Sequence, residues 1–292
     1  MLSTRLSRST STRPSTTSIA SARTRNGADV SEASRGATVS VSKQQRQDEL
    51  ARLIYERGSI RTDELIELFD VSPMTLYRDL ATLESKRLVR RSRGEVAAVT
   101  NSTSETPISF RLVQDVSAKA KIAKVAAEIL ADYSTIFLDD STTALAIVDL
   151  LPDVQQKTYI TNSLAVSRAL SQSVQGKLIS LGGTYNPQLD AFFGPTATKE
   201  ITNLNPSAVV VGAASVQNFA VYHPYAEVGS FKSLAMSQAE FSVLVVAAPK
   251  FKRTSLHKMA EISDFDCVIT DDGIDEETLA ELRGETHVIV AR

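Results

Sequence analysis

From residue 117 to the C-terminus, short apolar runs alternate with segments whose apolar residues recur at helical spacing. This alternation is typical of an α/β domain with a largely parallel sheet. The expected strands are Thr135–Leu138, Thr158–Ile160, Lys177–Leu181, Ala208–Val211, Ser242–Ala247, Cys267–Thr270 and Val288–Ala291. The expected helices are Ala118–Tyr133, Ala144–Leu151, Leu164–Ser171, Phe231–Ala239 and Asp275–Arg283. We therefore predict one α/β domain over residues 117–292.

Residues 43–100 carry a different pattern. Apolar residues at helical spacing predict a first helix that stops at Gly58, and a short second helix follows. Ser72-Pro73, an N-cap followed by proline at the first helical position, begins a third helix. Two β-prone stretches around Gly94 then predict a two-stranded wing. Three helices followed by a hairpin predict a winged helix-turn-helix.

The third helix leaves side chains free at its N-terminal end, because its apolar stripe is Leu76, Leu80 and Leu83. In a helix-turn-helix the second helix of the motif lies in the major groove, and its first residues reach the base edges. The candidate DNA-binding residues are Ser72, Met74, Thr75, Tyr77 and Arg78 on the helix and Arg90, Arg91 and Arg93 on the wing. Any one of these residues is more often merely solvated, so the prediction depends on their arrangement.

The first 42 residues contain eighteen serines and threonines, six basic side chains and two acidic ones. Such a composition cannot bury enough apolar surface to offset chain entropy, so we predict a disordered tail over residues 1–42. An organelle transit peptide, a mis-assigned start and a non-specific DNA-binding arm would share this composition. A polar linker is expected over residues 101–116, between the two folded domains.

The remaining composition limits the class of protein. A single cysteine, Cys267, excludes an intramolecular disulfide and a multi-cysteine zinc site, which favours the reducing cytoplasm. The longest apolar runs, Val209–Ala214 and Val243–Ala248, are far shorter than the roughly 20 residues that cross a bilayer. The three histidines lack metal-ligand spacing, so we expect a soluble protein without a cofactor or a metal.

A polar cluster follows the first strand of the α/β domain. Ser141, Thr142 and Thr143 lie between a strand end and a helix start, after Asp139 and Asp140. Hydroxyls and backbone N–H groups at such a place form an anion site, and a phosphate fits there on physical grounds. The plainer alternative is N-capping without a ligand. Asp139 and Asp140 could form a carboxylate pair, but adjacent carboxylates in a turn are usually solvated or cap a helix.

The run from Arg46 to Glu84 resembles the N-terminal signature of the DeoR family of bacterial regulators, whose third helix reads VSxxTIRRDLxxLE. The matching residues are Val71, Ser72, Thr75, Arg78, Asp79, Leu80, Leu83 and Glu84. Leu76 and Tyr77 depart from the pattern, as do Lys86 and the SRGE sequence at residues 92–95. In the second domain the resemblance extends over DDSTT, YITNSLAV, LGGTY, VVVGAAS, EVGSFKSLAM and PKFKRTSLHKMAEISDFDCVITD, in the family's order. Ser141 replaces a glycine of the family's DSGTT loop, and Ala248 or Pro249 stands where an aspartate is usual.

The resemblance implies a repressor that binds double-stranded operator DNA and a sensor domain similar in fold to ribose-5-phosphate isomerase. It implies that the sensor binds a phosphorylated sugar or related metabolite without turning it over. The effector-binding residues carried over from the family are Asp139, Ser141, Thr142, Thr143, Gly183, Gly212 and Lys232. Because paired recognition helices must meet successive major grooves about 34 Å apart, a homo-oligomer, a dimer or a tetramer, is implied.

Two other classes of function remain open at this point. A sugar-phosphate isomerase-like enzyme with an appended DNA-binding module is disfavoured, because the loop Gly212–Ser215 has no acidic residue for proton transfer. An oligomerisation protein with a vestigial pocket differs from a sensor in that it would not bind an effector.

Overall fold

The computed structural model describes residues 42–86, 88–99, 102–151, 156–173 and 175–292. The tail predicted over residues 1–42 therefore lies outside the described residues, except for Ser42. The Ser42 hydroxyl accepts a hydrogen bond from the backbone N–H of Gln45, and the Gln45 side chain accepts one in return from the Ser42 backbone. This capping box begins the first helix at Lys43, where the sequence predicts it.

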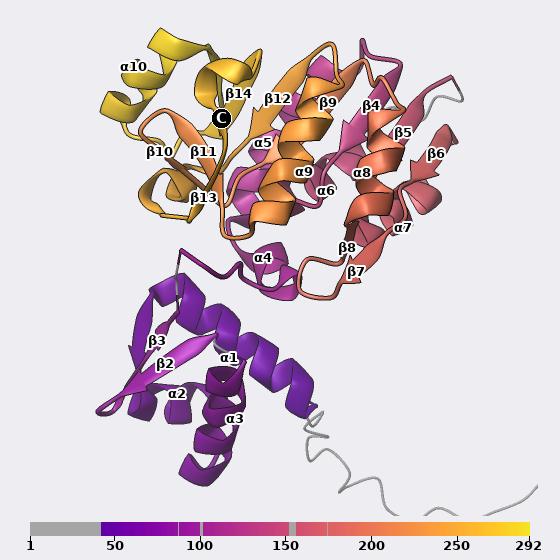
Figure 1. Ribbon diagram of the computed structural model, residues 1–292. Helices are drawn as coiled ribbons and strands as arrows, with labels where there is room; N and C mark the ends of the chain where they lie inside the picture. The colour runs from indigo at the N-terminus through magenta and orange to yellow at the C-terminus, as the bar shows by residue number, and fades with distance from the viewer. Residues whose placement is uncertain (1–41, 87, 100–101, 152–155, 174) are drawn as a thin grey trace, which may run out of the picture. The chain divides into compact units, whose positions relative to one another are not determined.

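The N-terminal domain is a winged helix-turn-helix (Figure 1). Its helices are α1 (Lys43–Arg57), α2 (Thr62–Phe69) and α3 (Pro73–Ser85), and its strands are β1 (Ser59–Arg61), β2 (Val89–Ser92) and β3 (Glu95–Ala98). The strands form an antiparallel sheet in the order β1-β3-β2. Buried leucines of all three helices, including Leu50, Leu65, Leu76 and Leu80, make the core of the domain.

Strand β1 is an addition to the predicted two-stranded wing. It pairs with β3 over three residues, of which Ile60 is buried. A strand of three residues is too short to show alternation in the sequence.

The C-terminal domain is built on a seven-stranded sheet in which every neighbouring pair is parallel. The strands are β4 (Thr135–Leu138), β5 (Thr158–Thr161), β6 (Lys177–Ser180), β9 (Ala208–Gly212), β12 (Ser242–Val245), β14 (Cys267–Asp271) and β15 (His287–Ala291). They coincide with the seven predicted runs to within two residues at either end. The spatial order β15-β14-β12-β9-β4-β5-β6 is that of a doubly wound α/β fold.

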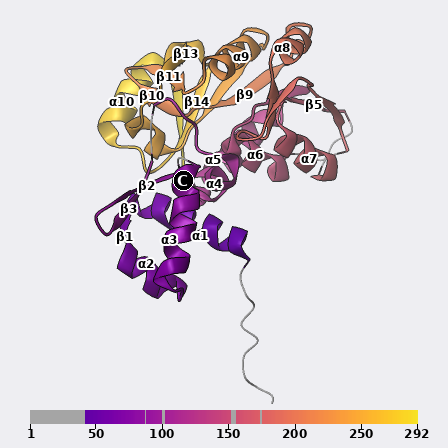
Figure 2. The same ribbon diagram turned by 60° about the horizontal axis from the view of Figure 1, so that its bottom comes forward.

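Helices cover both faces of this sheet. They are α5 (Val116–Leu130), α6 (Thr142–Ile147), α7 (Leu164–Ser173), α8 (Pro195–Thr202), α9 (Ala226–Ser237) and α10 (Glu276–Glu285). Apolar residues of α5, α6 and α7 pack into one hydrophobic cluster, and those of α8, α9 and α10 pack into the other. Figure 2 shows α5, α6 and α7 on one side of the sheet and α8 and α9 on the other.

Several short elements are not expected from the sequence. They are α4 (Ile108–Val113), β7 (Thr184–Asn186), β8 (Ala191–Phe193), β10 (Ser215–Gln217), β11 (Ala220–His223), β13 (His257–Glu261) and helix α8. Strands β10, β11 and β13 form a small antiparallel sheet, and β7 pairs with β8. Helix α4 lies in the segment 101–116 that the sequence predicts to be a linker. Among the residues that the structure describes, no helix is long and apolar enough to span a membrane.

The sheet reverses its direction of growth between β4 and β9. From β4 the chain adds β5 and β6 on one side, and from β9 it adds β12, β14 and β15 on the other. Such a topological switch point opens a crevice at the carboxyl ends of the two central strands, where α/β proteins bind ligands. The loops that follow Leu138 and Gly212 therefore meet at this point.

Candidate functional site

Asp139 joins the two loops at the switch point. Its Oδ1 accepts a hydrogen bond from the Ser141 backbone N–H at 2.9 Å, and its Oδ2 accepts one from the Gly212 backbone N–H at 2.7 Å. The residue is fully buried. Asp139 thus lies beneath the site and holds its loops, instead of lining the pocket as the resemblance implies.

Lys232 on α9 completes a buried ionic cluster. Its Nζ lies 2.7 Å from Asp139 Oδ2 and 3.0 Å from Asp140 Oδ1, and it donates to the Gly212 carbonyl at 3.2 Å. Burial opposes the charge of Lys232, but the two carboxylates outweigh burial and raise its pKa above the ordinary value. Lys232 is therefore a cation whose charge these carboxylates already balance, although the resemblance assigns it to the effector-binding residues.

Ser141 and Gly212 pack closely against each other. The Ser141 hydroxyl caps α6 by accepting a hydrogen bond from the Ala144 backbone N–H at 3.0 Å. A Cβ added to Gly212 would lie 2.3 Å from the Ser141 Cβ, which no real structure tolerates. The side chain of Ser141 thus leaves no room for a side chain at position 212, where the glycine fits.

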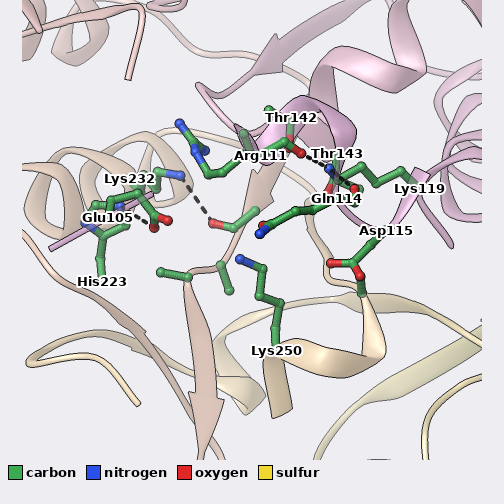
Figure 3. A pocket seen from close by; sticks show the side chains of 15 residues that line it. Glu105, Arg111, Gln114, Asp115, Lys119, Thr142, Thr143, His223, Lys232 and Lys250 are labelled. Atoms are coloured by element: carbon green, nitrogen blue, oxygen red, sulfur yellow. Dashed lines mark hydrogen bonds and ion pairs between the residues drawn. The ribbon is translucent and has the colours of Figure 1, made fainter. Parts of the chain in front are cut away.

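A small polar cavity, partly open to solvent, lies at this switch point (Figure 3). The side chains and backbone that line it come from distant segments. They are Glu105, Arg111, Gln114, Asp115, Lys119, Ser141, Thr142, Thr143, Gly212, Ala213, Ala214, His223, Lys232, Ala247 and Lys250. Five of the seven predicted effector residues are among them. Gly183 is not, and its φ of +142° and the Phe193 carbonyl, 2.4 Å from where its Cβ would be, explain the glycine by close packing.

Three cations at the cavity are absent from the sequence prediction. Arg111 lies on the unexpected helix α4, Lys119 on α5, and Lys250 in the short helix Ala248–Lys252. The Lys119 Nζ donates to the carbonyls of Arg111 and Gln114, and burial lowers the pKa of Lys119 to about 8. Burial likewise lowers the pKa of Lys250 to about 8. The sequence did contain a signal for Lys119. It lies on the same helix face as the apolar Ile122, where a lysine is unexpected.

His223 also lines the cavity, although the sequence assigns it no role. Its Nδ1 accepts a hydrogen bond from the Tyr225 backbone N–H at 3.1 Å, and its Nε2 lies 3.8 Å from Glu105 Oε2. Burial lowers the pKa of His223 to about 4, so the imidazole is neutral near pH 7. In the described part of the chain no group of three or more His, Cys, Asp or Glu residues is arranged to hold a metal ion.

On the winged helix, the start of α3 presents the predicted side chains to solvent. Met74 is 62% exposed, Tyr77 is 46% exposed, and Arg78 is exposed as well. Ser72 caps α3 by accepting from the Thr75 backbone N–H at 3.2 Å, and the two hydroxyls lie 2.9 Å apart. Ser72 and Thr75 thus already have local hydrogen bonds, whereas the other three side chains are open to a partner.

The predicted basic residues of the wing divide into two kinds. Arg90 and Arg93 are exposed. Arg91 is tied to α3, because its Nε donates to Glu84 Oε2 at 2.7 Å and its backbone N–H donates to Glu84 Oε1 at 3.1 Å. Arg91 therefore positions the wing.

Asp79, one of the residues that match the family pattern, anchors α3 to α1. It is buried and accepts hydrogen bonds from Arg46 Nε and Gln47 Nε2, each at 2.7 Å. The orientation of α3 therefore depends on a charged contact that no local pattern in α3 reveals.

The fold and the cavity together define a class of protein: a DNA-binding regulator with a winged helix and a separate ligand-sensing domain. Residues 46–102 match the DeoR-like helix-turn-helix domain, and residues 114–272 match the DeoR C terminal sensor domain. The chain belongs to the DeoR family, as the sequence resemblance predicts. It is a transcriptional regulator and not an enzyme.

Two curated relatives illustrate this membership. The chain is 32% identical over 234 residues to the transcriptional repressor AccR of Agrobacterium fabrum, across 80% of this chain and 91% of that protein. It is 29% identical over 229 residues to the glycerol-3-phosphate regulon repressor of Escherichia coli, across 78% and 90% of the two chains. A solved ribose 5-phosphate isomerase A from Neisseria gonorrhoeae covers 45% of this chain and 52% of its own at 15% identity, with a TM-score of 0.33.

The comparisons do not favour the isomerase alternative. The loop Gly212–Ser215 has no acidic residue, but the carboxylates of Glu105 and Asp115 line the cavity. The missing acid in the loop is therefore a weak criterion by itself. The matched relatives, which are named as regulators, carry the conclusion.

Proposed function

We propose that this protein is a repressor whose binding to operator DNA is controlled by a phosphorylated sugar or a related phosphorylated metabolite. The observation that carries the proposal is the polar cavity at the switch point of the sensor sheet. The hydroxyls of Thr142 and Thr143 line it together with Arg111 and Lys250. Hydroxyl donors and cations at a partly enclosed site suit a phosphate monoester, and neutral hydroxyl groups of a sugar suit the remaining polar surface.

The relatives support the same proposal. One is named as the repressor of a glycerol-3-phosphate regulon, so a phosphorylated three-carbon compound belongs in the set of effectors to be tested. In the proposed mechanism the winged helices of a homo-oligomer contact two operator half-sites, with Met74, Tyr77 and Arg78 toward the bases and Arg90 and Arg93 toward phosphates. The protein would act in the cytoplasm.

A thermal-shift screen tests the proposal. Full-length protein is heated with phosphorylated sugars and sugar alcohols, and with the same compounds lacking the phosphate. A ligand at about 100 times its dissociation constant stabilises the folded state by roughly 2.7 kcal/mol, which corresponds to about 5 to 11 °C for a domain of this size. A phosphorylated compound should raise the melting temperature, and its parent sugar should not.

Two measurements complete the test. The active compound should change the affinity of the protein for operator DNA in a fluorescence anisotropy titration, and sedimentation should give a dimer or a tetramer. The compound should be recovered chemically unchanged. Absence of stabilisation by every phosphorylated compound, or steady isomerisation of one of them, contradicts the proposal.

A further inference from the structure

The chain segment between the two family-matched regions contributes to the cavity. The helix-turn-helix match ends at residue 102, and the sensor match begins at residue 114. Glu105 and Arg111 fall between them, yet both line the cavity and both are buried. A segment that follows the DNA-binding domain is therefore a wall of the candidate effector site.

Arg111 is held in place from three directions. Its backbone carbonyl accepts hydrogen bonds from Lys119 Nζ on α5 and, at 3.4 Å, from the Thr142 hydroxyl on α6. Its Nε donates to the Thr106 carbonyl at 3.0 Å. These contacts hold the backbone carbonyl of Arg111 and the Nε edge of its guanidinium, and they leave the Nη2 end to a ligand.

One end of the Arg111 guanidinium is unused. The Nη2 atom is buried and has no hydrogen-bond partner among the described residues, and Arg111 as a whole is only 8% exposed. An arginine stays charged at any ordinary pH, so it cannot relieve this by losing its proton. Buried polar groups nearly always have a partner, and an orphaned donor at a cavity points to a missing acceptor.

The surroundings favour an anion as that acceptor. Figure 3 shows the Lys250 amine pointing toward the middle of the cavity from the side opposite Arg111 and Thr142. His223 also lines the cavity, and its imidazole is neutral near pH 7. Lys232 is already paired with Asp139 and Asp140. Burial opposes the charge of Glu105 on the same cavity, but Lys250 and Arg111 outweigh it and lower its pKa. Arg111 and Lys250, on opposite walls, thus share one carboxylate, which leaves positive charge for an anion.

We propose that Arg111 binds the phosphate group of the effector, and that effector binding thereby immobilises the segment of residues 103–114 that leads from the winged helix into the sensor. The inference rests on the proposed function, because it assigns a residue and a route of control to the same cavity. The planar guanidinium fork suits a phosphate, which accepts two hydrogen bonds from it at once. Control of DNA binding then passes through the segment that touches the ligand.

The test uses full-length protein and inorganic phosphate, with acetate as a singly charged carboxylate for comparison. Phosphate binding is measured by calorimetry, and hydrogen exchange of the amides in residues 103–114 is measured with and without phosphate. Arg111→Gln should weaken phosphate binding by about 10- to 100-fold, the effect of losing a charge-assisted pair. Phosphate should slow exchange in this segment of the wild type and not in the variant, and acetate should do neither.

Two further variants keep the test decisive. Arg168→Gln makes the same chemical change at a side chain that is 66% exposed and 3.7 Å from Asp190, and it should bind phosphate as the wild type does. Arg111→Lys keeps the charge and should fold even if Arg111→Gln does not. It should weaken phosphate binding about 3- to 10-fold, because an ammonium cannot reproduce the bidentate fork.

The outcomes distinguish failure of the proposed function from failure of the role of Arg111. If neither inorganic phosphate nor any phosphorylated compound of the screen stabilises the wild type, the proposed function is wrong, and the role of Arg111 falls with it. If these compounds stabilise the wild type and both folded Arg111 variants equally, the role of Arg111 alone is wrong. If Arg111→Gln loses phosphate but exchange in residues 103–114 never responds to phosphate, the route of control is wrong.

Discussion

Replacing Lys232 by methionine should lower the stability of the protein, because it disrupts the buried ionic cluster beneath the cavity. Lys232 Nζ lies 2.7 Å from Asp139 Oδ2 and 3.0 Å from Asp140 Oδ1, and all three residues are buried. Removing one partner of a buried ion pair leaves uncompensated charge and costs about 3–5 kcal/mol of unfolding free energy. Asp139 keeps the backbone N–H donors of Ser141 and Gly212, so most of the penalty should fall on Asp140.

The loss should depend on pH in a defined direction. In the wild type burial opposes the charge of Asp140, but Lys232 outweighs it and lowers the pKa of that carboxyl. Its stabilising contribution is therefore present above the unfolded pKa of about 3.9 and is lost as the pH falls below it. Without Lys232, burial alone should raise the pKa of Asp140, so the deficit of the variant should be largest near neutral pH and shrink toward about pH 4.

Urea unfolding followed by circular dichroism, at several pH values, measures this deficit. Lys121→Met is the matched control, since Lys121 pairs with Asp272 at the surface, and such pairs contribute about 0–1 kcal/mol. The double variant Lys232→Met with Asp140→Asn should recover part of the lost stability. A loss below about 1 kcal/mol in Lys232→Met, or a deficit that does not change with pH, would refute the reasoning.

Other contacts make equally specific predictions. Gly212→Ala should lower stability by about 1–3 kcal/mol through overlap with Ser141, and adding Ser141→Gly should restore part of it in the same urea assay; no loss in the single variant contradicts the clash. Arg78→Gln should reduce discrimination between operator and random duplex, whereas Arg90→Gln should weaken both and flatten the salt dependence; an unchanged specificity ratio in Arg78→Gln contradicts the placement of α3. Because burial holds the pKa of His223 near 4, against an ordinary value of 6.5, the folded protein binds fewer protons than the unfolded chain between these values. Stability should therefore fall by about 3 kcal/mol as the pH drops through that window, and His223→Gln should remove this dependence; an identical pH profile in the variant argues against it.

Local signals in the sequence were sufficient for the framework of the fold. The Ser72 cap followed by proline begins α3 where it is predicted, and the apolar runs of the second domain coincide with the seven parallel strands. These features succeed because capping, proline geometry and hydrophobic periodicity act on the backbone within a few residues. The placement of Ser141, Thr142 and Thr143 at the end of β4 follows from the same kind of signal.

The chemistry of the site was decided by tertiary structure. Lys232 meets Asp139 across 93 residues of sequence, and only the order of the strands, with β9 beside β4, brings α9 over that aspartate. Arg111 lies in a six-residue helix inside a polar stretch, too short to be recognised by periodicity. Whether a charge is free or already paired depends on such distant neighbours, and the sequence therefore predicted where a ligand would bind but not which cations remain open to it.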